Sequence, residues 1–202
     1  MNFENRTVLV TGAARGLGFA YARALAELGA RVVIHDVGAD AHGSGYDPQV
    51  ADDAAATLRA EGHDATAASG SLDTRESCRA LIEQTIADHG RLDGLIHNAG
   101  WVAYQTIEEI EEAAFDRMMA VAAEAPLWLA QAAWPAMKEA GYGRIVLTTS
   151  CRALYPQYVQ AGLASYAAAK MAAVGIVNVL AAEGASLGIV VNAISPVAKT
   201  RM

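Results

Sequence analysis

Thr11-Gly12-Ala13-Ala14-Arg15-Gly16-Leu17-Gly18 separates two segments of different character. A short, β-branched, apolar run at 6–10 precedes it, and residues 19–29 follow it with helical periodicity and a closing glycine. This order predicts a strand, a tight turn and a helix. The three glycines let the backbone approach a pyrophosphate, and the helix N-terminus offers free N–H groups and the positive end of its dipole. We therefore expect the turn to hold a dinucleotide.

On the glycines alone, an ordinary glycine-rich turn is an equal alternative. A second apolar strand at 31–35 favours the dinucleotide because it ends in Asp36, 18 residues after Gly18. That separation is close to the ~20 residues at which a Rossmann acidic side chain binds the ribose hydroxyls. A carboxylate there repels a 2′-phosphate, which favours NAD over NADP. The guanidinium of Arg15 is able to reach a 2′-phosphate, so NADP stays open as the alternative.

Composition indicates one α/β domain over residues 1–202. The 202 residues are 53% hydrophobic, enough for one substantial core. Acids and bases are interspersed at a net charge of −7, which argues against nucleic acid or a membrane surface as partner. No apolar run reaches the ~18 residues of a spanning helix and the N-terminus lacks signal-peptide features, so we expect a cytoplasmic protein. Two distant cysteines and five scattered histidines predict no metal site.

Strand and helix patterns alternate along the chain. Residues 37–48 are turn formers and predict a loop, and the expected helices cover 49–60, 74–89, 108–140 and 166–186. Strands are expected at 64–69, 92–97, 143–150 and 188–193, and residues 151–165 as a loop. Alternation of this kind predicts a doubly wound, Rossmann-like parallel sheet in three αβα layers. The fourth strand runs into Asn98-Ala99-Gly100, at the sheet edge where such folds bind ligands.

The long helix at 108–140 carries more apolar residues than one face against a sheet requires. Core packing is one explanation, and a helix–helix interface with a second subunit is the other. Pro126 and Pro135 predict local kinks in it. The aromatic residues Trp101, Tyr104, Tyr155 and Tyr158 hint at an apolar pocket, although each also suits a core or a surface.

Tyr166 and Lys170 are four residues apart, so they share one face of a helix. Such a pair on its own also fits an ordinary solvated turn. Reduction of a carbonyl by a nicotinamide requires a proton donor, and a tyrosine serves if its pKa falls from ~10 towards neutrality. A neighbouring ammonium favours the phenolate. Ser150, at the end of the preceding strand, is placed to hydrogen-bond the same substrate oxygen.

Over its whole length the chain resembles the classical short-chain dehydrogenases/reductases. The motifs that carry the resemblance are the turn at 11–18, Asn98-Ala99-Gly100, Ser150, Tyr166-x-x-x-Lys170, and Asn192-Ala193-Ile194-Ser195-Pro196 with Thr200. The loop with Gly38, His42-Gly43 and Gly45 resembles the branch that acts on 3-hydroxyacyl thioesters.

The resemblance implies a role for each matched residue. Tyr166 is implied as the catalytic acid/base, Lys170 as the group that lowers its pKa and holds the nicotinamide ribose, and Ser150 as the group that orients the substrate. It also implies a dimer or a tetramer. The implied cofactor-binding residues are Thr11, Gly12, Arg15, Gly16, Leu17, Gly18, Asp36, Ser71, Leu72, Asn98, Ala99, Gly100, Tyr166, Lys170, Pro196, Val197 and Thr200.

Four positions depart from the family pattern. The asparagine usual in the long helix, which is held to anchor a water that supplies protons to the lysine, is replaced by Ala122. Ser71 stands where an aspartate often lies beside the adenine. The Ser150–Tyr166 spacing is three residues longer than usual, which leaves Thr149 as the alternative hydroxyl. The family normally continues past Thr200 with a substrate lid and another strand, so we expect the C-terminal part to be short or missing.

Two functions are therefore open. The first is an NAD(H)-dependent dehydrogenase or reductase of a small alcohol or carbonyl compound, and the intact Ser150, Tyr166 and Lys170 favour it. The second is a catalytically impaired relative that binds a nucleotide as a partner or sensor subunit. Ala122 and the missing lid favour the second.

Overall fold

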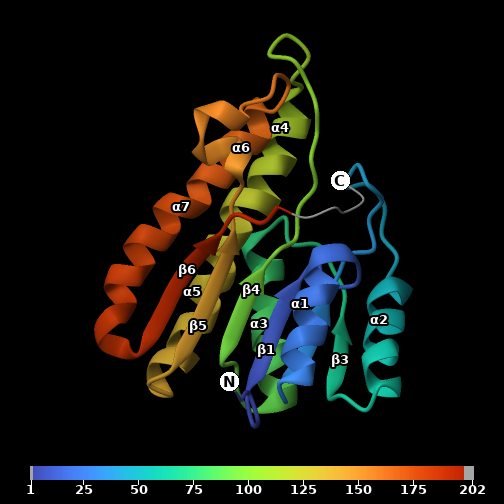
Figure 1. Cartoon of the computed structure of the whole chain (residues 1–202), viewed down its shortest axis with the longest axis vertical. Helices are drawn as coiled ribbons and strands as arrows, with labels where there is room; N and C mark the ends of the chain where they lie inside the picture. The colour runs from blue at the N-terminus through green and yellow to red at the C-terminus, as the bar shows by residue number, and fades with distance from the viewer. Residues whose placement is uncertain (1, 198–202) are drawn as a thin grey trace.

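The computed structural model describes residues 2–197. Its centre is a six-stranded parallel sheet in the order β3-β2-β1-β4-β5-β6 (Figure 1). The strands are β1 (Thr7–Thr11), β2 (Arg31–His35), β3 (Ala65–Ala68), β4 (Gly94–His97), β5 (Gly143–Thr148) and β6 (Ile189–Ile194). The α-helices are α1 (Gly16–Glu27), α2 (Gln49–Ala60), α3 (Arg75–His89), α4 (Glu112–Met119), α5 (Ala125–Glu139), α6 (Cys151–Leu154) and α7 (Ala164–Gly184). A π-helical turn η1 (Ala120–Glu124) joins α4 to α5, and 3-10 turns occupy η2 (Pro156–Tyr158) and η3 (Ala185–Leu187).

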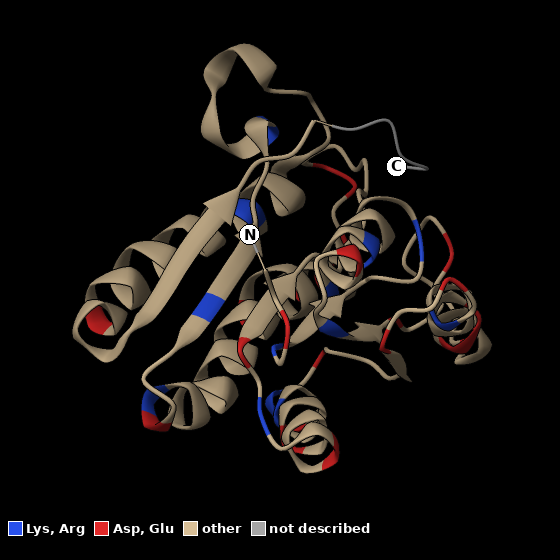
Figure 2. Cartoon of the chain, turned by 60° about the horizontal axis from the view of Figure 1, so that its bottom comes forward, with Lys and Arg blue, Asp and Glu red and all other residues tan. Residues whose placement is uncertain are grey.

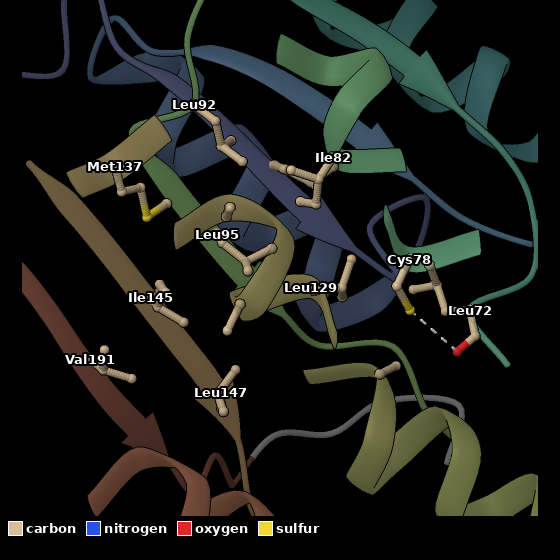
Figure 3. Close-up of a cluster of buried hydrophobic side chains, with 14 of the residues drawn as sticks. Leu72, Cys78, Ile82, Leu92, Leu95, Leu129, Met137, Ile145, Leu147 and Val191 are labelled. Carbon is tan, nitrogen blue, oxygen red and sulfur yellow. Dashed lines mark hydrogen bonds between the residues drawn. The ribbon is translucent and has the colours of Figure 1, made fainter. Parts of the chain in front are cut away.

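The predicted Rossmann-like sheet is confirmed, and side-chain alternation explains its layers. Leu95 of β4 points towards α3 and α5, where it packs with Leu129 and Met137 (Figure 3). Leu9 of β1 belongs to the same cluster. Val10 of β1 belongs to the opposite cluster, which α1 and α2 cover. Central strands covered on both faces are apolar at successive positions, which is why β1 reads as a continuous apolar run.

Helix ends follow local chemistry. The side chain of Thr74 accepts a hydrogen bond from the backbone N–H of Ser77, and the Ser77 side chain closes a capping box at the start of α3. Gly90 ends that helix with φ of 74°, a left-handed conformation that favours glycine. Such signals made the ends of α3 predictable.

Coverage of the sheet is uneven. Helices α3, α5 and α7 lie on one face, whereas α1 and α2 cover the other face only over β1 to β3. Within residues 2–197, no helix covers the second face of β5 and β6, and Val190 of β6 is 44% exposed there. The three layers are thus complete over only part of the sheet.

Two expected segments differ in the structure. The expected loop at 151–165 contains α6 and η2, because Ser150 Oγ accepts the N–H of Arg152 and caps a short helix. The expected helix at 108–140 begins at Glu112 and is interrupted by the π-turn η1. Pro126 lies in the first turn of α5, where its missing N–H is tolerated, and Pro135 lies inside that helix.

The expectation that no apolar stretch reaches spanning length was also wrong. Residues 164–187, comprising α7 and η3, are long and apolar enough to cross a membrane by length and composition. In the structure one side of this segment packs against β6 and β5, while its other side is exposed. Figure 2 shows acidic and basic residues interspersed over the other elements, while α7 carries only Lys170 and Glu183.

Candidate active site

A cavity of about 700 Å³ opens at the carboxyl ends of the strands. That volume lies within the range of cofactor and ligand sites. The turn after β1, the ends of β2, β4 and β5 and the start of α7 all contribute to it. Predicted site residues that line it are Gly12, Arg15, Gly16, Leu17, Asp36, Ser71, Leu72, Asn98, Ala99, Gly100, Ser150, Tyr166, Lys170, Pro196 and Val197.

Two predicted residues lie behind this lining. Thr11 is fully buried, and its Oγ1 accepts the N–H groups of Asn98 and Ala99 at 3.2 Å each. Gly18 is buried in the first turn of α1. Their contribution is to hold the cavity wall together. Thr200 lies outside the described residues.

The glycine turn has the close backbone packing that a pyrophosphate-binding turn requires. A Cβ on Gly12, whose φ is +61°, would lie 2.7 Å from the Ala99 Cα, and one on Gly18 would lie 2.1 Å from the Gly12 carbonyl oxygen. Neither contact is sterically possible, so both positions require glycine. The backbone of the turn, the Asn98–Gly100 segment and the start of α1 are therefore closely packed, and the α1 N-terminus faces the cavity lined by Gly16 and Leu17.

Asp36 is fixed by backbone hydrogen bonds at the end of β2. Its Oδ2 accepts the N–H of Ala14 at 3.1 Å and its Oδ1 accepts the N–H of Gly38 at 2.8 Å. The carboxylate thus connects the glycine turn to the loop after β2, and it lines the cavity where a ribose would lie. This second, structural role is not readable from the sequence.

Ser150, Tyr166 and Lys170 come together at the other end of the cavity. Ser150 lies close enough to the Tyr166 phenol to lower its pKa. Lys170 is 3% exposed, its Nζ donates to the Thr148 carbonyl at 3.0 Å, and it lies 6.0 Å from the centre of the Tyr166 ring. The three side chains therefore surround one face of the cavity.

The charges around Tyr166 differ from what the resemblance implies. Burial raises the pKa of the Tyr166 phenol, and the Ser150 hydrogen bond and the Arg152 charge oppose that rise. Burial also lowers the pKa of Lys170 to about 8. Arg152, on the unexpected helix α6, also favours the Tyr166 phenolate, with a smaller effect on the pKa than burial or Ser150.

Sequence reasoning missed a closure over the cavity. The loop after β2 bends back onto Trp101: a Cβ on Gly43 would lie 2.6 Å from the Trp101 ring. Arg117 stacks over the same ring at 4.7 Å and donates to the His42 carbonyl at 3.1 Å. The signal was the row of glycines in the loop, but nothing local identified Trp101 as their partner.

The suggested aromatic pocket is confirmed only in part. Trp101 is buried against α4 and η1, and Tyr104 lines the cavity although it is largely exposed. Tyr155 and Tyr158 are exposed and pack edge to face with each other outside the cavity lining. Among residues 2–197, no group of three or more His, Cys, Asp or Glu side chains is arranged to hold a metal ion.

Comparisons with known proteins agree with this geometry. The family model of the short chain dehydrogenases matches residues 6–202. A protein of Mycobacterium tuberculosis named as a short-chain type dehydrogenase/reductase is 36% identical over 98% of this chain and 68% of its own length. The peroxisomal multifunctional enzyme type 2 of Mus musculus is 37% identical over all of this chain, which spans 27% of the mouse enzyme. Among solved structures, a metagenomic short-chain oxidoreductase in complex with NADP has a TM-score of 0.86 at 29% identity, covering 98% of this chain and 84% of that one.

Proposed function

This chain belongs to the short-chain dehydrogenase family, and from that membership we propose that it transfers a hydride between NAD(H) and a secondary alcohol or its ketone. The observation that carries the proposal is the meeting of Ser150, Tyr166 and Lys170 in the cavity that the glycine turn also lines. A nicotinamide bound there supplies or accepts the hydride.

The chain's own residues supply the proton chemistry. In the direction of ketone reduction, the Tyr166 phenol donates its proton to the substrate oxygen, and the Ser150 hydroxyl hydrogen-bonds the same oxygen. The Lys170 ammonium faces the segment at Gly100, where a Cβ would lie 3.7 Å from its Nζ. It is therefore placed to hold the ribose next to the nicotinamide.

Cofactor choice follows from Asp36. Its negative charge lies at the ribose end of the cavity and disfavours a 2′-phosphate, which supports NAD. Arg15 lines the same end, and the solved relative is bound to NADP, so NADPH binding is the alternative outcome of the test.

The proposed substrate is a 3-hydroxyacyl or 3-oxoacyl thioester. Similarity to the peroxisomal multifunctional enzymes and the glycine-rich loop after Asp36 support this choice. Tyr104 and Arg152 line the cavity beside Tyr166 and offer an apolar ring and a cation to such a substrate.

We further propose that two copies associate through α5 and α7. The outer face of α7 exposes Met171 and Val179, the latter to 57%. An apolar face with few charges fits burial against a second subunit. Val179→Arg should then yield a monomer in sedimentation velocity, whereas Leu28→Arg, at an exposed apolar site beyond α1, should not.

The decisive experiment is an assay of NADH and NADPH oxidation with a panel of ketones and 3-oxoacyl thioesters. Tyr166→Phe should abolish turnover while NADH still binds, because the phenol acts only on the substrate oxygen. Tight NADH binding without turnover on any carbonyl would favour a nucleotide-binding partner or sensor instead.

A further inference from the structure

The π-turn η1 leaves one part-buried carbonyl, that of Val121, without a donor in either the α or the π register of its own helix. The Ala125 N–H donates to the Ala120 carbonyl, five residues back. In that register the Val121 carbonyl would receive the N–H of residue 126, which is Pro126 and has none. An α-helical register offers no remedy, since its donor would be the Ala125 N–H already in use. A donor from elsewhere is required.

His97, at the end of β4, supplies that donor. Its Nε2 lies 3.0 Å from the Val121 carbonyl oxygen, and because a carbonyl only accepts, Nε2 carries the hydrogen. The other ring nitrogen, Nδ1, lies 3.0 Å from Thr11 Oγ1. Since that oxygen accepts two backbone N–H groups, its own hydrogen is available to Nδ1. The contacts therefore define a single tautomer.

The imidazole is held neutral. Burial lowers the pKa of His97 to about 3, and the nearby charge of Lys170 acts in the same direction. A neutral ring donates at one end and accepts at the other, as the Val121 carbonyl and the Thr11 hydroxyl require. The bridge from the phosphate turn to η1 is therefore intact across the pH range of an assay.

The π-turn is the surface against which the catalytic helix packs. Ala122 and Ala123 belong to one buried cluster with Ala169, and the Tyr166 ring packs against that cluster. Lys170 follows Ala169 directly. A shift of η1 would therefore displace the wall behind Tyr166 and Lys170. Displacements of about 1 Å at such a site cost up to ~10²-fold in rate.

We propose that His97 is a positioning residue, which donates the hydrogen bond that Pro126 withholds and so fixes the π-turn behind Tyr166 and Lys170. Its effect on turnover rests on the proposed function, whereas its contact with Val121 does not. Because His97 of β4 holds the turn at the Val121 carbonyl, the turn needs no polar side chain at residue 122, and alanine is tolerated there.

The test compares His97→Leu, which loses donor and acceptor, with His97→Gln, whose amide offers both. We expect His97→Leu to lower kcat by about tenfold to 10²-fold, with the NADH dissociation constant and the KM of the ketone changed less than about twofold. His97→Gln should keep most of the turnover. His89→Leu, which removes an imidazole bonded to Thr66 far from the cavity, is the matched control.

A second substitution, Pro126→Ala, tests the proposal more directly. It restores a backbone N–H that reaches the Val121 carbonyl in the π register, so the double variant His97→Leu/Pro126→Ala should recover much of the lost kcat. If His97→Leu does not fold alone, the double variant must fold and turn over. No recovery in the double variant, or full turnover in His97→Leu, would overturn the proposal.

Hydrogen–deuterium exchange separates this proposal from the proposed function. Peptides covering residues 118–130 should exchange faster in His97→Leu than in wild type, even if no ketone is ever reduced. Unchanged exchange in those peptides would refute the role of His97. Faster exchange in His97→Leu, together with a wild type that reduces no ketone, would refute only the hydride-transfer function.

Discussion

The Thr149 hydroxyl donates a hydrogen bond of 2.7 Å to the main-chain carbonyl of Lys170. Both groups are buried, and the bond joins the end of β5 to the first turns of α7. Thr149 is therefore committed to the backbone, which leaves Ser150 as the hydroxyl that acts on the Tyr166 phenol.

Replacing Ser150 should mainly affect turnover, whereas replacing Thr149 should mainly affect stability. Ser150→Ala should lower kcat by about 10²- to 10³-fold because a donor to the substrate oxygen is lost, and should cost about 0.5–2 kcal/mol of stability because Ser150 also caps α6. Thr149→Val removes this buried hydrogen bond, although the Lys170 carbonyl keeps its helical donor within α7, and should lower the free energy of unfolding by about 0.5–1.5 kcal/mol. Urea denaturation and steady-state kinetics on both variants check this. The assignment of Ser150 is wrong if Thr149→Val, at full stability, loses more turnover.

Lys170→Met should stabilise the protein while abolishing turnover. The pKa of Lys170 is about 8 in the fold against its ordinary 10.5, so the charged form is disfavoured by burial. Between these pH values the unfolded chain binds more protons, and wild-type stability rises with pH. At pH 7 the variant should be more stable by about 1–3 kcal/mol. Its unfolding free energy should also lack the rise between pH 8 and 10.5, and denaturant titrations at pH 7 and 10 measure both.

Asp36 combines charge with structure, and two variants separate these effects. Asp36→Asn keeps a side-chain oxygen as acceptor but removes the charge, so the preference for NADH over NADPH should shrink about tenfold or more. Asp36→Ala also leaves the N–H groups of Ala14 and Gly38 unpaired and should unfold at a lower temperature. Fluorescence titration of both cofactors gives the preference. If the wild type binds NADPH as tightly as NADH, then Arg15, and not Asp36, determines the cofactor preference.

Arg152 should contribute to the pH dependence of alcohol oxidation. That direction requires the Tyr166 phenolate, which Arg152 favours against the effect of burial. Arg152→Ala should therefore raise the pKa of Tyr166 and move the rising limb of kcat to higher pH, whereas Arg152→Lys should move it less. The pH–rate profile measures this, and an unmoved limb in Arg152→Ala would mean that another cation acts on the phenol.

Ala122→Asn restores the asparagine that is usual in the family at this position and tests whether its absence limits turnover. The sequence alone predicts a gain in turnover if proton supply limits the rate. The structure predicts a loss, because Ala122 is 1% exposed in an apolar cluster and a buried amide without partners costs about 1–3 kcal/mol. Thermal unfolding and kcat of the variant distinguish the two, and a stable variant with higher kcat would restore the first expectation.

The sequence by itself determined the sheet, the glycine turn, Asp36 and the Tyr166–Lys170 pair. Strand and helix periodicity, capping residues and glycine turns depend on residues a few positions apart, so they are legible without the fold. Asn98-Ala99-Gly100 was found for the same reason, since it follows directly on a strand end.

Only the tertiary structure decided which polar groups meet. His97 and Val121 are 24 residues apart, and Thr149 and the Lys170 carbonyl are 21 apart. The π-turn itself depends on a donor from a neighbouring strand, so helical periodicity read the segment as one long helix. Likewise, the contact of Gly43 with Trp101 adds a steric requirement from a distant segment to the one that its φ of +75° already imposes. Hydrogen-bond direction and steric contact between distant segments are properties of packing, which no local pattern encodes.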